Sequence, residues 1–497
     1  MNTRSSSGIR VKSIHAKRLF GMYDHDVVLK DERTTIVFGR NGVGKTVMFK
    51  LTHAILSGEM AAMLDLLCYP YSEFKVVLSD GGEVVAVRDD PEGASQAELL
   101  VEEREDVAVR NKRKVADQVR LTYSPASGEP VNSFAINEGT FNKLASRLER
   151  HLPFPRVAPE RWRDNETGEG MSALEVIARW GEMSDDDVSK ELREWRGLVG
   201  NRLPQSLLIQ AQRLIRVGHS SARQYIRPEG ATIRDTVLAY SADLKNRIDQ
   251  TLAQYGREAQ RLDQTYPQRL LQQASAPAGE GLMEQSVISE SLQTMKQQQA
   301  EYQALGILGE QPQEMGPNQD ALLTTDVYRA AMSVYVRDAQ EKLKIVHNLA
   351  QRVQLLLKLI GEKFSNKKLK VDPKTHDLVV ESTHGHVQQL SVNALSSGEQ
   401  HQLVLAYDLL FRTQPNTLVL LDEPELSLHV EWQERFLEDL KAVFDVECFD
   451  ALLSTFSPYI INGHIELTVG LYVRVSPDAD RWCAWTSAFT THHRRWP

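Results

Sequence analysis

The chain has 497 residues, 41% of them hydrophobic and 25% charged, which is the balance of a globular protein large enough for more than one domain. Its formal charge of −9 makes the whole molecule a poor electrostatic partner for nucleic acid, although a local basic face is still possible. No segment has the roughly 18 uninterrupted apolar residues of a membrane span, and the N-terminus lacks a secretory apolar region, so a cytoplasmic chain without membrane contact is expected.

A phosphate-binding loop is predicted within residues 34–50, TTIVFGRNGVGKTVMFK. The segment reads as an apolar strand, a glycine-rich turn and a helix, which is the G-x-x-x-x-G-K-[ST] pattern in the context that its mechanism requires. Backbone N–H groups can surround phosphates, Lys45 can reach the β and γ oxygens of ATP, and the Thr46 hydroxyl can ligate Mg²⁺. The residues expected to contact the nucleotide here are Gly39, Arg40, Asn41, Gly42, Val43, Gly44, Lys45 and Thr46.

The segment after the loop predicts a β-hairpin and then a large insertion. Residues 74–90 alternate in polarity around an Asp-Gly-Gly turn, so residues 1–125 are expected to belong to the nucleotide-binding head. Ser396 comes 350 positions after Thr46, far more than one crossover needs, so another domain is expected to be inserted. Residues 126–230 read as mixed, with a strand in SLLIQAQRLI that returns to the head.

Residues 231–364 are predicted to form a helical arm. Spacings of four and three alternate along one seam: Tyr328, Met332, Tyr335, Ala339, Lys342, Val346, Leu349, Val353, Leu356 and Ile360. An upstream helix has the same spacing from Ile248 to Tyr266, and Pro267 is expected to stop it. Each helix would be about 50 Å long at 1.5 Å per residue. A coiled-coil arm and a compact helical bundle both bury such seams, so both stay open.

Two further motifs lie in residues 365–497. In NALSSGEQHQLVLAYDLLF, Ser396 and Glu399 have capping-box spacing, which predicts a helix with a well-marked N-terminus. In NTLVLLDEPELSLH, residues 418–421 read as a buried parallel strand. Asp422 at its end suits Mg²⁺ held through a water, and Glu423 suits the orientation or deprotonation of an attacking water. An apolar strand with two acids is weak evidence alone, but it is strong evidence beside a P-loop.

These motifs together resemble a known group of ATPases. The run Leu395, Ser396, Ser397, Gly398 and Glu399 resembles the signature loop LSGGQ, and the motif order resembles the ABC-type heads of SMC, RecF and OLD proteins. The phrases QAQRLI and DEPELSLHVEWQ resemble more narrowly the bacterial AAA_15-like ATPases, which include PtuA of Septu and of certain retron defence systems. The resemblance covers roughly the first 60 and last 110 residues well.

The resemblance implies an α/β fold, in which an ABC-type P-loop head is interrupted by the helical, coiled-coil-like insertion. It also implies head-to-head dimers around two ATP molecules with Mg²⁺, in which the signature residues of one chain contact ATP held by the other. His429 would then lie at the D-loop end that faces the other subunit. The implied partner is an HNH-type nuclease, with nucleic acid, or a reverse transcriptase and its msDNA, as possible further components. The alternative is a RecF- or SMC-like repair or chromosome ATPase that clamps DNA itself.

Three positions depart from the pattern of this group. Ser397 replaces a glycine and Glu399 a glutamine, both common variants. The switch loop, usually T-H-S-P, has Phe456 in place of the histidine, which predicts a slow ATPase that dwells in the ATP-bound, paired state. The alternative interpretation is that the loop is shifted relative to that of the related heads, so that another polar residue, such as Ser457, contacts the γ-phosphate.

Other clusters carry weaker signals. The basic runs at residues 110–114, 367–370 and 492–495 are more often solvated faces than nucleic-acid sites. The scattered Cys68, Cys448 and Cys483 lack CxxC spacing and are expected to be packing residues. No nuclease motif was found, so any chemistry on nucleic acid is expected to come from another protein.

Overall fold

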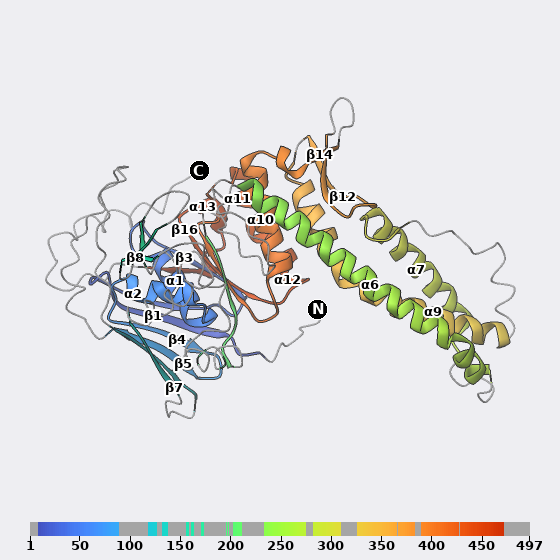
Figure 1. The fold of residues 1–497 in the computed structure, drawn as a ribbon, viewed down its shortest axis with the longest axis horizontal. Coiled ribbons are helices and arrows are strands. Elements are labelled where there is room, and N and C mark those ends of the chain that lie inside the picture. Colours follow the sequence, from blue (N-terminus) through green and yellow to red (C-terminus); the bar gives the residue numbers. More distant parts are fainter. Residues whose placement is uncertain are drawn as a thin grey trace.

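The computed structural model describes residues 8–88, 118–126, 132–137, 156–158, 161–163, 170–172, 195, 197, 202–210, 233–274, 282–309, 326–364, 366–382, 389–426 and 428–471. In this part of the chain, a head built around two large sheets carries a long helical arm (Figure 1). The basic runs at residues 110–114 and 492–495, Cys483 and most of residues 126–230 lie outside the described residues.

A five-stranded parallel sheet forms the centre of the head. Its strands, in order across the sheet, are β11 (Ser206–Ile209), β15 (Leu418–Asp422), β16 (Asp450–Thr455), β3 (Thr34–Phe38) and β17 (Thr468–Gly470). The predicted buried strand is confirmed as β15. The predicted returning strand is confirmed for its first four residues, which form β11 beside β15, while residues 211–215 lie outside the described residues. Because parallel strands end at the same edge, the loops that follow β3, β15 and β16 meet there.

The parallel sheet is buried on both faces, and its side chains alternate between two hydrophobic cores. In β15, Leu418 and Leu420 belong to one core, whereas Val419 and Leu421 belong to the other. The first core contains buried residues of α1 (Lys45–Ser57), and the second contains those of α10 (Ser397–Tyr407). The P-loop helix α1 and the signature helix α10 therefore cover opposite faces of the sheet.

A six-stranded antiparallel sheet packs in the first core. Its order is β2 (Tyr23–Val28), β1 (Val11–Leu19), β4 (Glu73–Leu78), β5 (Glu83–Arg88), β6 (Val119–Ser124) and β7 (Asn132–Ile136). The predicted hairpin is confirmed as β4 and β5: Gly81 has a φ of +88°, and Asp80 Oδ1 accepts the Gly82 N–H at 2.9 Å. Two small sheets are β8 (Arg156–Ala158), β9 (Arg161–Arg163) and β10 (Gly170–Ser172), and β12 (Lys367–Val371), β13 (Leu378–Ser382) and β14 (Gln389–Ser391).

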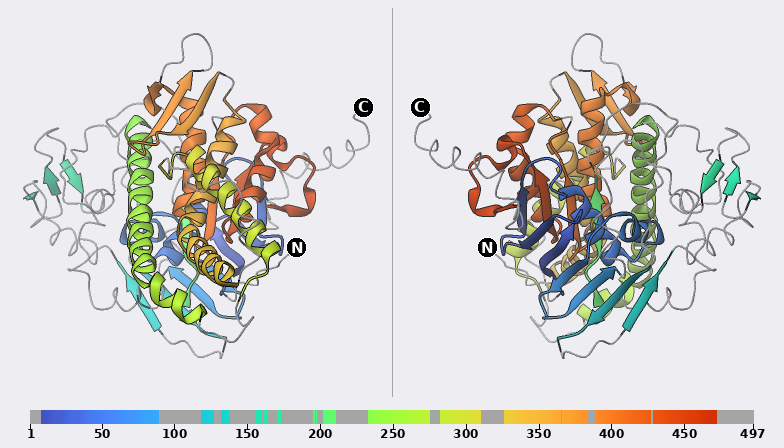
Figure 2. Two further views of the ribbon diagram at one scale, coloured as in Figure 1. Left: turned by 90° about the vertical axis from the view of Figure 1, so that its right-hand side faces the viewer. Right: turned by 90° about the vertical axis from the view of Figure 1, so that its left-hand side faces the viewer.

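Three helices build the arm: α6 (Ile233–Ala274), α7 (Gln285–Ala304) and α9 (Asp326–Gly361). Helices α6 and α9 lie side by side and project from the head, which favours the arm over the compact bundle (Figure 1). Figure 2 shows the molecule from its two ends, with the arm toward the viewer in the left-hand view. Helix α7 was not predicted; it packs on α9, and Tyr302 Oη lies 2.9 Å from His347 Nδ1. No helix within the described ranges is long and apolar enough to span a membrane.

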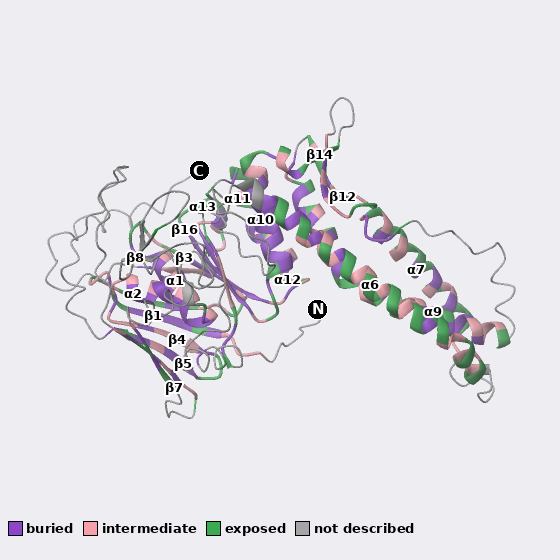
Figure 3. Cartoon of the chain, in the orientation of Figure 1, coloured by how far each residue is buried: buried purple, intermediate pink, exposed green. Residues whose placement is uncertain are grey.

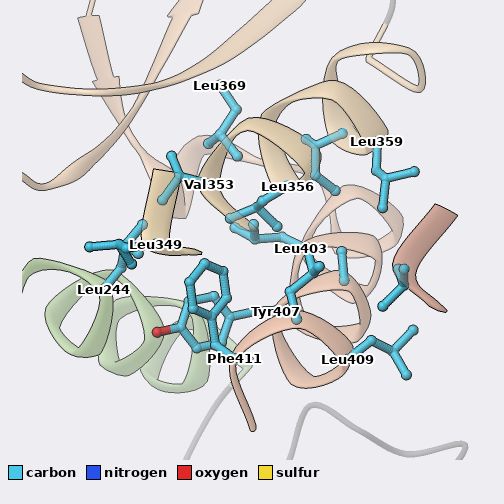
Figure 4. Packing of buried hydrophobic residues seen from close by; sticks show 14 of the residues in the cluster. Leu244, Leu349, Val353, Leu356, Leu359, Leu369, Leu403, Tyr407, Leu409 and Phe411 are labelled. Carbon is cyan, nitrogen blue, oxygen red and sulfur yellow. The ribbon is translucent and has the colours of Figure 1, made fainter. Parts of the chain in front are cut away.

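The second core joins the arm to the signature helix. The Tyr407 ring of α10 stacks on Tyr240 of α6 and on Phe411 of the π-helical turn that follows, with ring centroids 4.5 and 4.6 Å away. Figure 4 shows Leu244 of α6 and Leu349 of α9 in the same cluster. Movement of the arm base would therefore disturb the packing of α10.

The prediction that Pro267 stops the upstream helix is wrong, because α6 continues through it to Ala274. A proline inside a helix removes one backbone hydrogen bond. Contacts nearby compensate for this loss: Arg269 donates 2.7 Å hydrogen bonds to the Leu262 carbonyl and to Asp338 Oδ2 of α9. Tertiary pairing with α9 thus overrides the local preference of the proline.

The predicted seam of α9 is wrong at Tyr335, whereas Met332 is buried as expected and Tyr328 and Ala339 pack against the second core. Tyr335 is 38% exposed, while Val336 and Leu343 are buried. In the second half of α9 the predicted residues are buried. Val346 and Val353, for example, are fully buried. The arm helices show a buried face toward one another and an exposed face outside (Figure 3). A straight helix drifts relative to a strict seven-residue repeat, so one face cannot keep the same positions over ten turns.

The ion pair between Arg269 and Asp338 provides a test of this arm. Asp338 is buried, so we expect Arg269→Met to leave an unpaired carboxylate and to lower the unfolding free energy of the arm by about 2 kcal/mol. Hydrogen exchange along α6 and α9 measures this change. Arg261→Met, which removes an exposed pair with Glu258 on the same helix, is the control and should cost much less. Equal effects of the two substitutions would contradict the account.

Candidate nucleotide-binding site

The turn between β3 and α1 depends on its glycines. Gly42 and Gly44 have φ angles of +82° and +95°, a region that favours glycine. A Cβ on Gly44 would also lie 2.4 Å from Leu19 Cδ2 of β1, so this position is closed to larger residues. His25 of β2 supports the loop from within the head, since its Nε2 lies 2.7 Å from the Val43 carbonyl oxygen. The turn is thus held in a shape that only this glycine pattern permits.

Lys45, the first residue of α1, lies folded into the loop. Its ammonium donates hydrogen bonds to the carbonyl oxygens of Gly39 and Arg40, at 2.7 and 3.1 Å. Burial lowers the pKa of Lys45, and the nearby carboxylate of Glu423 opposes this effect. The side chain is therefore at the mouth of the glycine turn, within reach of the positions that phosphate oxygens occupy in such loops.

Thr46 and Asp422 come together at the carboxyl edge of the sheet. Thr46 Oγ1 donates to Asp422 Oδ1 at 3.1 Å, and Ser454 Oγ donates to the same oxygen at 2.6 Å. Asp422 and Ser454 are direct partners in the pairing of β15 with β16. Hydroxyl and carboxylate oxygens in this arrangement fit Mg²⁺, which uses few protein ligands and keeps several waters.

Glu423 lies in a strained turn directly after β15. Its φ of +48° is unusual for a non-glycine residue, and its N–H is bonded to the Ser454 carbonyl at 2.9 Å. Burial, together with Asp422 and Glu425, raises the pKa of Glu423, whereas Lys45 lowers it. Because a general base must be ionised, the raised pKa means that Glu423 loses this ability at a higher pH than an ordinary glutamate.

The loop after β16 places Phe456 over the lysine. The Phe456 ring is 37% exposed, and its centroid lies 5.1 Å from Lys45 Nζ, within the range of a cation–π contact. The neighbouring Ser457 has its hydroxyl engaged elsewhere: it donates to Gln433 Oε1 at 2.6 Å and accepts the Tyr459 N–H at 3.3 Å. In this arrangement Phe456, and not Ser457, faces the P-loop lysine.

The signature residues start α10 on the other face of the sheet. The predicted capping box is confirmed: Glu399 Oε2 accepts the Ser396 N–H at 2.6 Å, and Ser396 Oγ accepts the Glu399 N–H at 3.4 Å. Lys367 also binds Glu399 Oε2, at 2.7 Å. Ser396 and Ser397 are exposed, while Gly398 lies half-buried in the first turn. Glu399 is thus committed to contacts in its own chain, and the two serines are presented outward.

The structure does not bring every predicted site residue to one place. One group lies at the carboxyl edge of the parallel sheet and consists of Lys45, Thr46, Asp422, Glu423 and Phe456. The signature residues lie across the sheet, in the second core's layer. The roles of all these residues in binding and catalysis stay predictions.

His429 precedes the short helix α11 (Val430–Glu434), and its side chain is 66% exposed. It makes an edge contact with Trp432, with ring centroids 6.3 Å apart. Its exposed place on the surface leaves it open to contact with another subunit, which stays a prediction.

Two residues near the site belong to motifs quoted from the sequence but were given no role there. Glu425 is buried, and its Oε1 accepts the Thr455 hydroxyl at 2.7 Å. Gln210 directly follows β11, and since Ile209 pairs with Leu421, it lies beside the end of β15 with an exposed side chain. The third acid in DEPE and the glutamine at the end of SLLIQ were the available signals.

Comparisons with known proteins cover part of this site. Residues 257–462 match the model of a family described as "AAA domain, putative AbiEii toxin, Type IV TA system". This segment is less than half of the chain; it contains the signature and the Asp422–Glu423 pair, and it begins after the P-loop. The comparison with curated proteins finds no match.

Solved structures give weak similarities. The Smc head domain of Pyrococcus furiosus, with an extended coiled coil and bound to the C-terminal domain of ScpA, has 11% identity, 94% coverage of each chain and a TM-score of 0.33. The SMC head domain of Thermotoga maritima has 10% identity, covers 93% of this chain and 94% of its own, and has a TM-score of 0.29. The strand order and the P-loop geometry establish the fold. The chain carries an α/β head of the P-loop type, interrupted by a helical insertion.

The position of Phe456 leads to a test by substitution. Because phenylalanine neither donates nor accepts a hydrogen bond, we expect Phe456→His to raise single-turnover ATP hydrolysis by roughly 10- to 100-fold. Glu423→Gln should abolish hydrolysis while ATP binding persists. Rapid-quench measurement of ATP turnover with excess protein gives both rates. An unchanged rate in Phe456→His, with native turnover already fast and dependent on Glu423, would show that no sensor is missing.

Proposed function

We propose that two copies of this chain pair head to head around two ATP molecules, each bound with Mg²⁺. The observation that carries this proposal is the placement of α1 and α10 on opposite faces of one sheet. Ser396 therefore lies across the sheet from the P-loop of its own chain. A second chain can supply its exposed serines and the N-terminus of its α10, which attracts anions.

Each ATP would be contacted by residues of both chains. Lys45 and the backbone of the glycine turn hold the phosphates, while Thr46 and Asp422 hold Mg²⁺, which supplies charge neutralisation at the phosphates. Ser396 and the start of α10 from the other chain close over the γ-phosphate. ATP thereby becomes part of the contact between the heads, so its binding drives pairing.

Hydrolysis would depend on Glu423, with little help from the switch loop. The strained turn fixes Glu423 near Lys45, where its carboxylate can orient a water or accept its proton. The Phe456 ring lies against the same lysine and has no polar atom that could hold that water. We therefore infer a slow ATPase that dwells in the ATP-bound pair, so that nucleotide acts as a restraint on a partner more than as continuous fuel.

The partner that best fits this proposal is a nuclease of the HNH type, carried by a separate chain in a prokaryotic antiviral complex. The resemblance of the signature and DEPE segments to AAA_15-like ATPases, which include PtuA of Septu and retron systems, supports it. Nucleic acid, or a reverse transcriptase with msDNA, would then act on the complex in the cytoplasm.

A chain that clamps DNA itself is the alternative. Within the described residues, the basic run at 367–370 offers it little support. Lys367 pairs with Glu399, and Lys370 pairs with Glu381, so two of its three lysines are engaged in ion pairs.

Substitution of the serine at the start of α10 tests the pairing. We expect Ser396→Arg to prevent ATP-dependent pairing and to leave ATP affinity nearly unchanged, because this residue contacts only the nucleotide of the other chain. Lys45→Ala should lose both ATP binding and ATP-dependent pairing. Sedimentation velocity and nucleotide titration measure the two properties. Gln293→Arg, an equal change of charge on an exposed position of α7, is the control. Normal pairing by Ser396→Arg would mean that the sandwich of two heads is wrong.

A further inference from the structure

Glu425 is a buried acid that the mechanism above does not use. It lies two residues after Glu423 and is only 7% exposed. Its Oε1 accepts two hydrogen bonds from the loop after β16: the Thr455 hydroxyl at 2.7 Å and the Phe456 N–H at 3.2 Å. Its Oε2 is also buried and has no hydrogen-bond partner among the described residues.

The stability of the fold does not by itself explain a buried acid at this position. A buried carboxylate oxygen without a partner costs free energy, and a neutral side chain would avoid this cost. The two bonds of Oε1 both go to one loop, the loop that carries Phe456. The carboxylate therefore acts as a link between two loops at the same edge of the sheet.

Two sets of hydrogen bonds join the turn after β15 to the loop after β16 at the candidate active site. At one end, the strained backbone of Glu423 donates its N–H to the Ser454 carbonyl. At the other end, the Glu425 carboxylate holds Thr455 and the Phe456 backbone. The turn after β15 and the loop after β16 are thus joined by hydrogen bonds at residue 423 and again at residue 425.

A second anchor holds the next residue of the loop. Ser457 donates to Gln433 Oε1, and Gln433 Nε2 donates to the Leu428 carbonyl at 3.0 Å. Phe456 therefore has one anchor on each side, Glu425 before it and Gln433 after it. If Glu425 is removed, the loop keeps its downstream anchor but loses its register with the Glu423 turn.

We propose that Glu425 is a positioning residue that fixes Glu423 and Phe456 relative to Lys45 for ATP hydrolysis. It acts on the site through its bonds to Thr455 and to the Phe456 backbone. The inference rests on the proposed function, since it assigns a role in that hydrolysis. Small displacements of reacting groups have large kinetic effects and small effects on ground-state binding. The role should therefore show in the rate of the chemical step and not in ATP affinity.

The test compares Glu425→Ala, Glu425→Gln, Thr455→Val and Thr455→Ser in the full chain with Mg-ATP. We expect Glu425→Ala and Thr455→Val to slow single-turnover hydrolysis by about 10- to 100-fold, with ATP affinity changed by less than about twofold. Thr455→Ser keeps the hydroxyl and should keep the rate. Glu425→Gln keeps one acceptor oxygen, so its hydrolysis rate should lie between that of the native chain and that of Glu425→Ala. The double variant Glu425→Ala, Thr455→Val should slow hydrolysis by less than the product of the two single effects, because both substitutions remove the bond between Thr455 and Glu425.

A matched control separates positioning from stability. Thr413 is 2% exposed and its hydroxyl donates to the Asp408 carbonyl at 3.2 Å, away from the P-loop, so Thr413→Val removes a comparable buried bond. It should lower stability as much as Thr455→Val and leave the rate unchanged. Equal slowing by both would reduce Glu425 to a structural residue.

The outcomes also distinguish this inference from the proposed function. If the native chain hydrolyses ATP through Glu423 and the Glu425 and Thr455 variants keep that rate, the positioning role is wrong and the proposed function stands. If the native chain neither binds nor hydrolyses ATP, the proposed function fails first. If Glu425→Ala does not fold, Thr455→Val decides, because it changes one hydroxyl for a methyl group of similar size.

Discussion

The alternation of side chains across the parallel sheet is the constraint on which the rest of the structure depends. Successive residues of β15 point into different cores, so the helices that fill those cores must lie on opposite sides. One core takes the P-loop helix and the antiparallel sheet, and the other takes the signature helix and the base of the arm. A chain built in this way has both sets of residues that are predicted to contact ATP, but it holds them on opposite faces of the sheet.

The carboxyl edge of the same sheet explains why one half is already well ordered. Pairing of β15 with β16 sets Asp422 beside Ser454, and this register brings the acid to Thr46. Glu423 then turns with a positive φ, held by the neighbouring strand. Hydrogen bonds between the chain's own residues thus arrange the groups expected to hold Mg²⁺ and water, and the apolar ring of Phe456 lies against Lys45.

The sequence predicted those features that depend on local chemistry. The P-loop follows from glycines such as Gly44, whose positive φ no other residue adopts easily, and the start of α10 follows from the capping-box spacing of Ser396 and Glu399. Features that depend on distant contacts were missed. Helix α6 passes Pro267 because Asp338, on another helix, binds Arg269. The role of Glu425 is equally hidden, because its partner Thr455 is 30 residues away in sequence.

The central claim is that each nucleotide site takes its parts from two chains, and mixing two defective chains tests it most directly. A chain with Lys45→Ala and a chain with Ser396→Ala are each expected to be defective in ATP hydrolysis. In a mixed pair, one site combines an intact Lys45 with an intact Ser396 from the other chain. The account predicts that the mixture hydrolyses ATP faster than the sum of its separate components, in proportion to the mixed pairs formed. Mixed pairs that form and show no gain in hydrolysis would contradict it.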